Sequence, residues 1–375
     1  MIPEPFPSPI YISQPMLPDL EELQKMIKLI WESNQLTNNG NMVKQLEKAL
    51  AVFLNVPYLS LISNGTIALQ LACKALRLSG EVITTPFTFA ATVHALAWNK
   101  IKPVFCDIEE DTFNINPNLI ESLITRETTA ILPVHVFGRP CKVRDIQNIA
   151  EKNGLKILYD AAHAFGVKID GYDIASFGDI SMFSLHATKI YHTIEGGALA
   201  FNNPYLKERI DSLKNFGILT EGNVQEPGTN GKLNELQAAV GILLLNLVEA
   251  EIARRKEITN LYRQMLIDIP GIQTNQDMKN VTHNYPYFVI RVEKKEFGLS
   301  RDELYEKLKE YNIITRKYFY PLCSNFSCYS NLFSAAKDRL PVANKIAETV
   351  LALPIYGKLS NDTVEKICTI IKSLR

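Results

Sequence analysis

The stretch DISMFSLHATKIYHTIEGGALAF, residues 179–201, combines strand, turn and lysine signals that together point to a fold and a chemistry. Its apolar start predicts a strand that ends at Ser184, and its apolar end predicts a second strand after Gly196 and Gly197. The two glycines indicate a tight turn that passes close to another group. Lys189 lies in the polar segment between the strands. Most lysines are solvated charges, but a lysine between two buried strands is a candidate to form a Schiff base with a carbonyl compound.

A second motif, KILYDAAHAFG (156–166), predicts a strand that ends in Asp160. Ligands of α/β folds bind at the carboxyl ends of the strands. A carboxylate in that place could keep a pyridine nitrogen protonated, which makes the ring an electron sink. The alternative is a helix cap or a surface turn. His163 would share the face of Asp160 if a helical turn begins here, and a purely structural histidine is the alternative.

Two other strand ends carry candidate binding residues. In LISNGTIALQLACKAL (61–76) a strand passes directly into a helix, and Gly65 with Thr66 could cradle a phosphate on free backbone amides. The alternative is that Thr66 simply caps its own helix. In TTPFTFAAT (84–92), Phe89 could lie flat against a planar cofactor ring, or it could be an ordinary core aromatic.

Strands that alternate with helices predict an α/β large domain with a mainly parallel central sheet, here residues 1–250 with an extended N-terminal segment. Residues 251–375 are predicted to form a smaller C-terminal α+β domain. Strands are expected at 58–63, 81–85, 102–107, 129–134, 156–160, 179–184, 288–292 and 314–321. Helices are expected at 19–31, 66–77, 90–98, 117–124, 143–153, 300–312, 340–352 and 360–374, with a long helix or a kinked pair over 232–265 and a turn at 36–42.

Composition excludes several classes of protein. The 375 residues are 46% apolar and carry 40 basic and 40 acidic side chains, so the basic excess of a nucleic-acid binder is missing. The six cysteines have no CxxC spacing and no histidine cluster, so neither a metal site nor disulfides are expected. No signal peptide or membrane span is predicted, and we expect a cytoplasmic protein. A nicotinamide-dependent enzyme would need a GxGxxG motif after the first strand, which is missing.

Together the motifs resemble the DegT-type sugar aminotransferases, which have the fold of aspartate aminotransferase (type I of the enzymes that use pyridoxal 5′-phosphate, PLP). The resemblance covers nearly the whole chain. It rests on the motifs LTNNG (36–40), NGTIAL, GEVITTPFTFAAT, PVHVFGRPC, DAAHAFG, SLHATKIYHTIEGGA, GTNGKLNELQAAVG (228–241), TRKYFYPL (315–322) and LALPIYGKL (351–359).

The resemblance implies a role for each matching residue. Lys189 would bind PLP covalently, Asp160 would pair with the pyridine nitrogen, His163 would lie beside the ring, and Phe89 would stack on it. Gly65, Thr66 and Ser184 match the phosphate cradle. Asn230 matches an asparagine that reaches the phosphate from the neighbouring subunit, which would require a homodimer. Relatives that act as sugar dehydrases have histidine at the lysine position, so Lys189 places this chain with the transaminases.

The form of the lysine loop, with the motifs TRKYFYPL and LPIY, resembles enzymes that aminate C4 of dTDP-4-keto-6-deoxyglucose, with L-glutamate as the usual amino donor. His186, Arg316, Tyr318 and Tyr320 are the candidates for contacting the nucleotide-sugar, although plain packing would explain the same residues. Cys323 stands where many relatives have histidine, which leaves sugar specificity open. The alternatives are amination at C3, another hexose, or a regulatory relative without catalysis.

Overall fold

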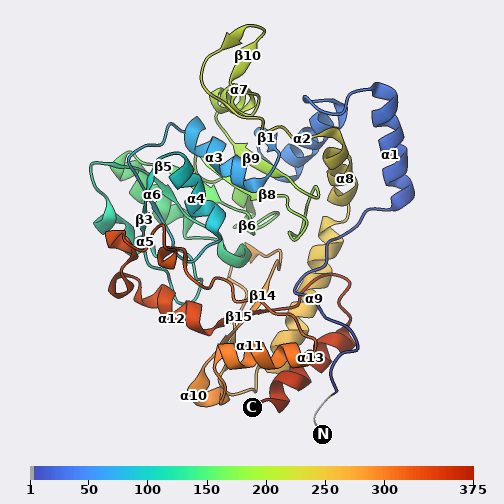
Figure 1. The fold of residues 1–375 in the computed structure, drawn as a ribbon, viewed down its shortest axis with the longest axis vertical. Helices are drawn as coiled ribbons and strands as arrows, with labels where there is room; N and C mark the ends of the chain where they lie inside the picture. The colour runs from blue at the N-terminus through green and yellow to red at the C-terminus, as the bar shows by residue number, and fades with distance from the viewer. Residues whose placement is uncertain (1–3) are drawn as a thin grey trace.

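A mixed seven-stranded sheet is the centre of the larger part of the molecule in this computed structural model, which describes residues 4–375 (Figure 1). Its strands are β1 (Tyr58–Ile62), β2 (Glu81–Thr84), β3 (Lys102–Phe105), β4 (Thr128–Leu132), β5 (Lys156–Asp160), β8 (Ile180–Ser184) and β9 (Gly197–Phe201). Their order is β1-β9-β8-β5-β4-β2-β3. Neighbours from β8 to β3 are parallel, whereas β9 pairs antiparallel with β8 and with β1. The prediction of a mainly parallel sheet is confirmed.

Both faces of this sheet are covered by helices. Consecutive strand residues such as Leu158 and Tyr159 belong to two different hydrophobic clusters, one on each face. Strands buried on both sides must be apolar almost throughout, and these apolar runs are the reason that the strands could be predicted from the sequence. One cluster takes the buried side chains of α3 (Gly65–Ala75), α4 (Ala90–Trp98) and α7 (Pro204–Leu213). The other takes those of α2 (Asn41–Phe53), α6 (Val143–Asn153) and α8 (Glu235–Leu245).

Smaller elements surround these layers. α1 (Leu20–Ser33) lies at the outer edge of the molecule, and the hairpin of β10 (Ile218–Thr220) and β11 (Asn223–Val224) stands away from the body (Figure 1). The strands β6 (Lys168–Ile169), β7 (Tyr172–Asp173) and β13 (Val281–Thr282) form a separate small sheet. The predicted helix 117–124 is shorter, α5 (Pro117–Ile120) followed by a 3-10 turn. The predicted turn at 36–42 ends earlier, since α2 already begins at Asn41.

The second part of the chain is built around a three-stranded antiparallel sheet, in the order β12-β14-β15. It contains β12 (Ile272–Thr274), β14 (Phe288–Val292), β15 (Val350–Leu353), α9 (Val248–Leu266), α10 (Lys294–Phe297), α11 (Arg301–Glu310), α12 (Pro341–Thr349) and α13 (Asn361–Ser373). This arrangement is the predicted α+β composition. Phe6 joins its hydrophobic cluster, so the N-terminal segment packs against the C-terminal part. The domain boundary at residue 250 stays a prediction.

A kinked pair of helices leads from one part to the other. The expected long helix over 232–265 is divided into α8 and α9, which are bent by 60° against each other. Among the described residues, no single helix is long and apolar enough to cross a membrane. The helices α8 and α9 reach the required length and apolar composition only when they are counted together.

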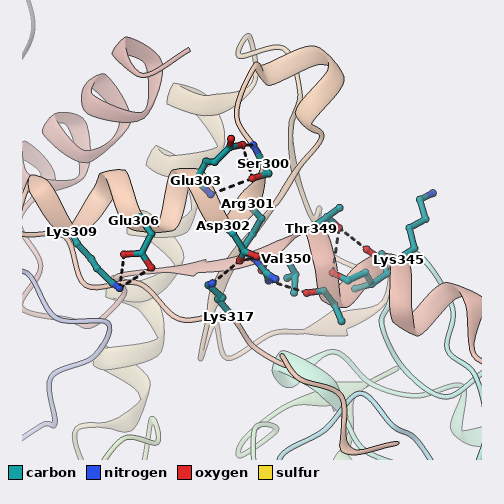
Figure 2. Close-up of polar contacts among 12 residues, drawn as sticks. Ser300, Arg301, Asp302, Glu303, Glu306, Lys309, Lys317, Lys345, Thr349 and Val350 are labelled. Carbon is teal, nitrogen blue, oxygen red and sulfur yellow. Dashed lines mark hydrogen bonds and ion pairs between the residues drawn. The ribbon is translucent and has the colours of Figure 1, made fainter. Parts of the chain in front are cut away.

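Two predictions in the C-terminal part are wrong. Residues 314–321 form no strand: Arg316 pairs with Ala352 in one isolated bridge, and the chain then turns, with Tyr320 donating from its amide to the carbonyl of Lys317. Side-chain contacts hold this segment instead, because Lys317 forms an ion pair with Asp302 of α11 (Figure 2). The expected helix 340–352 ends at Thr349, since the following apolar residues pair with β14 as the strand β15.

The N-terminus of α11 explains why its start was predictable. Ser300 and Glu303 form a reciprocal capping box (Figure 2). Arg301, the next residue, is buried, and its guanidinium donates to the carbonyls of Ala347 and Val350. The start of α11 is thereby fixed to the end of α12 and the beginning of β15.

Candidate active site

A cavity of about 660 Å³ opens at the carboxyl ends of the central strands. Nine of the residues predicted from the sequence line it together. They come from β5, β8, α3 and the segments that follow β2, β5 and β8, with one from the C-terminal part. They are Gly65, Thr66, Phe89, Asp160, His163, Ser184, His186, Lys189 and Tyr318.

Asp160 is the last residue of β5 and is buried in the cavity wall. Its Oδ2 accepts a hydrogen bond of 2.7 Å from the hydroxyl of Thr92, and its Oδ1 accepts one of 3.0 Å from the amide of Ala162. Burial raises the pKa of Asp160, while these two hydrogen bonds and the nearby Lys189 act in the opposite direction. The carboxylate is therefore held in one orientation by donors that favour its charged form.

Lys189 lies in the turn between β8 and β9, with its Nζ 3.3 Å from the hydroxyl oxygen of Tyr287. Desolvation lowers the pKa of this amine, and the opposing attraction of Asp160 is smaller. A lowered pKa increases the fraction of neutral amine, the form that attacks a carbonyl carbon. Burial also lowers the pKa of His163, with a further contribution from Lys189, so His163 is a neutral ring.

The turn from β1 into α3 has the form of an anion cradle. The N-cap is Asn64, whose side chain accepts from the amide of Ile67, so Thr66 is not the cap and its side chain is exposed. The amides of Gly65 and Thr66 belong to the first helical turn, where the helix itself supplies no acceptor. A Cβ on Gly65 would lie 3.2 Å from Cβ of Ser184, so glycine lets this turn approach the end of β8.

Phe89 and His186 also lie where contacts with a ligand are possible. Phe89 precedes α4 and is 61% exposed at the cavity, so it is not the core aromatic of the alternative interpretation. Nδ1 of His186 lies 2.8 Å from the hydroxyl of Thr188, and its Nε2 lies 3.4 Å from a carboxylate oxygen of Glu195, another residue of the cavity wall.

Three predicted site residues lie outside this cavity in the single chain. Arg316 is exposed, and Tyr320, which is 50% exposed, stacks on the guanidinium of Arg301 at 4.9 Å. Asn230 is exposed and forms an isolated bridge with Asn215 at the base of the β10–β11 hairpin. Their suggested roles stay predictions.

Sequence reasoning missed three residues of the site. Thr92 stands at the end of the quoted motif 84–92, and a hydroxyl one helical turn after Phe89 was an available signal. Tyr287 and Phe319 come from the C-terminal part of the chain, and both line the cavity. Nothing local in the sequence relates them to His163, because their proximity depends on how the two parts of the chain pack together.

Comparison with known proteins connects this geometry to a family. The DegT/DnrJ/EryC1/StrS aminotransferase family profile matches residues 19–372. The chain belongs to this family. It is 47% identical over 363 residues to the dTDP-4-amino-4,6-dideoxy-D-glucose transaminase of Escherichia coli, covering 96% of this chain and 98% of that protein. The Shigella dysenteriae transaminase of the same name is also 47% identical, over 98% of this chain and 99% of its own length.

A solved structure confirms the fold of this aminotransferase. DesI, solved in the presence of its TDP-sugar product, superimposes with a TM-score of 0.95 at 34% identity, covering 99% of this chain and 94% of that one. The sequence-based identification of the family and of an aminotransferase is confirmed, as is the type I fold.

Proposed function

We propose that the protein holds PLP on Lys189 and transfers the amino group of L-glutamate to dTDP-4-keto-6-deoxy-D-glucose, which gives dTDP-4-amino-4,6-dideoxy-D-glucose. The observation that carries this proposal is that Lys189 and Asp160 line one cavity, together with the β1–α3 turn. The names of the two relatives at 47% identity support this choice of sugar.

The residues present fit PLP. The β1–α3 turn offers amides and a threonine hydroxyl to a phosphate, and Gly197 keeps the turn close to β9, because a Cβ there would lie 2.6 Å from the carbonyl oxygen of Asn64. In the wall of the same cavity, Asp160 offers a buried carboxylate to a protonated ring nitrogen. The exposed ring of Phe89 is available to stack on a planar cofactor.

When bound, PLP supplies a carbonyl carbon for the amine and an electron sink for the bond that breaks. Asp160 would keep the ring nitrogen protonated by its charge, strengthened by burial. Lys189 would hold the cofactor covalently, and its Nζ would be the base that takes the proton from Cα of glutamate. The neutral ring of His163 would lie beside the cofactor without adding a charge there.

The sugar side of the site is proposed from fewer residues. His186 and Tyr318 line the cavity, so they are the first candidates for contacting the nucleotide-sugar. We propose a homodimer in which Asn230 of one subunit reaches the phosphate of the other. The exposed position of Asn230 beside the projecting hairpin is compatible with such a reach (Figure 1). Arg316 and Tyr320 do not line the cavity of the single chain, and we propose that they contact the sugar in the assembled enzyme.

The first experiment is an absorbance spectrum of the purified protein with PLP, before and after L-glutamate is added. A visible band that disappears with glutamate in the wild type is expected. Lys189→Ala should lose the lysine-bound form, whereas Lys168→Ala, an exposed lysine on β6, should behave as the wild type. A protein that stays colourless with PLP would contradict the proposal.

The acceptor is identified by the reverse half-reaction. Protein loaded with the amino form of the cofactor is mixed with 4-keto and 3-keto dTDP-sugars, and return of the visible band is followed. Nuclear magnetic resonance of the product then locates the new amino group. Amination at C3, or of another hexose, would leave the family assignment intact and replace the proposed substrate.

A further inference from the structure

Tyr287, directly before β14, is placed between two groups of the site. Its hydroxyl oxygen lies 3.3 Å from Nζ of Lys189 and 3.4 Å from Nε2 of His163. These distances allow one hydroxyl to exchange hydrogen bonds with both neighbours, so the direction of each bond depends on where the protons are.

The proton of His163 can be assigned from its other nitrogen. The amide of Phe137 donates to Nδ1 at 3.2 Å, so Nδ1 must be the unprotonated nitrogen of the ring. Because the ring is neutral, its one proton is on Nε2, which faces Tyr287. Phe137 and Phe319 lie parallel to this ring, with centroids 6.3 and 6.0 Å away, and they limit its rotation.

The direction of the second bond follows. Since Nε2 of His163 donates to the hydroxyl oxygen of Tyr287, that oxygen becomes a better donor and a poorer acceptor. We propose that Tyr287 is a positioning residue that donates its hydroxyl proton to the amine of Lys189, and so holds this amine in its neutral form with its lone pair in a fixed direction. This inference rests on the proposed function, in which Lys189 needs that form to react.

The other charged or titratable groups around these side chains are few. Asp160 from β5 attracts a proton to Lys189, and Tyr318 has its ring edge-on to Tyr287 at 5.6 Å. The charge of Arg255 of α9 acts to lower the pKa of Tyr287, and Arg255 is itself paired with Glu251 at 2.6 Å. These groups are unchanged when only the hydroxyl of Tyr287 is removed, so they do not obscure its effect.

The test measures the acidity of Lys189 directly in the cofactor-free full-length protein. Acetic anhydride is applied as a trace label between pH 6 and 10, and modification of the Lys189 peptide is quantified by mass spectrometry against a fully labelled standard. In Tyr287→Phe the half-labelling pH should rise by about one unit, so modification at lower pH falls about tenfold. Tyr318→Phe removes a hydroxyl from the same cavity without this bond, and it should cause no rise.

Two variants of His163 test the direction of the two hydrogen bonds that run from His163 through Tyr287 to Lys189, here called the relay. In His163→Leu the tyrosine loses its donor, so the half-labelling pH should move toward that of Tyr287→Phe. In His163→Gln a side-chain amide can still donate to the hydroxyl, and the half-labelling pH should return toward the wild type. If circular dichroism shows that Tyr287→Phe does not fold, the two His163 variants alone test the proposal. Equal half-labelling pH values for His163→Leu and His163→Gln would then overturn it.

An unchanged or lower half-labelling pH in folded Tyr287→Phe would also overturn it. The measurement needs no cofactor, so failure of this relay is distinct from failure of the proposed function. The latter would appear as wild-type protein that does not bind PLP, whatever the labelling of Lys189.

Discussion

Two regions of the chain supply candidate site residues, and the fold holds them in different ways. The first is called here the strand-end group and consists of Asp160, His163 and Lys189. The second is the segment 314–321. Asp160 ends β5 and is paired with the neighbouring parallel strand β8, whereas His163 and Lys189 lie in the turns that follow β5 and β8. The segment 314–321 has one isolated bridge, at Arg316, and one backbone hydrogen bond from Ile314 to Ile10. Its other contacts are made by side chains, among them the buried ring of Phe319 and the ion pair of Lys317 with Asp302.

The difference teaches where a site can vary within a family. Residues at the ends of a buried parallel sheet cannot move without moving the sheet, so this part suits the cofactor chemistry that all transaminases share. In a segment with little backbone pairing, the exposed side chains can change by substitution without loss of the core. Such a segment therefore suits the recognition of different acceptor sugars.

The largest effect is expected for Asp160→Asn. The amide keeps the shape of the side chain but has no charge with which to hold a proton on the ring nitrogen. We expect amino transfer to slow by about 100-fold, the value of one charge-assisted hydrogen bond. Stopped-flow measurement of the half-reaction with glutamate tests this. Asp170→Asn, which changes an exposed carboxylate paired with Arg144, is the control. A rate within threefold of the wild type would mean that the strand-end group does not control the chemistry.

Arg301→Ala tests the second region through stability. Arg301 is 1% exposed, and its loss would leave the carbonyls of Ala347 and Val350 without their donor and Tyr320 without its stacking partner. We expect the free energy of unfolding to fall by about 3 kcal/mol. Denaturant unfolding measures it, with Lys294→Ala, an exposed partner of Glu303, as control. If the segment is held as described, the KM for the sugar also rises while PLP binding is kept. Wild-type stability would show that these contacts contribute little.

The same contrast explains what could be predicted from the sequence. The strands β1 to β5 and β8 were predictable because burial on both faces makes them continuous apolar runs, and Asp160 and Ser184 were found because they end such runs. The segment 314–321 is rich in aromatic residues, which favour a strand, but its neighbour β15 is already paired with β14 and offers it one residue only. Tyr287 was invisible because its place depends on packing between the two parts of the chain.

Thr92→Val tests whether the surroundings of Asp160 matter as much as the carboxylate itself. The change removes the 2.7 Å hydrogen bond to Oδ2 and adds no charge. Since burial raises the pKa of Asp160 and this bond opposes the rise, the pKa should increase further. Asp160 is active when ionised, so the acid limb of the pH–rate profile should move up by about one unit. Thr92→Ser keeps a hydroxyl and should restore the wild-type profile. If the pH–rate profile is unchanged in Thr92→Val, the hydrogen bond from Thr92 does not control the ionisation of Asp160.

The smallest effects are expected within the segment 314–321, where two tyrosines serve as controls for each other. Tyr318 lines the cavity, whereas the ring of Tyr320 lies against Arg301 and is half exposed. Tyr318→Phe should raise the KM for the keto sugar about threefold, the value of one neutral hydrogen bond. Tyr320→Phe keeps the stacking ring and should change the KM less. Steady-state kinetics with saturating glutamate separates them. A larger effect of Tyr320→Phe than of Tyr318→Phe would mean that the segment takes a different arrangement in the assembled enzyme. Contacts made mainly by side chains can be replaced when a second subunit or a sugar binds. The hydrogen bonds between paired strands cannot be replaced in this way.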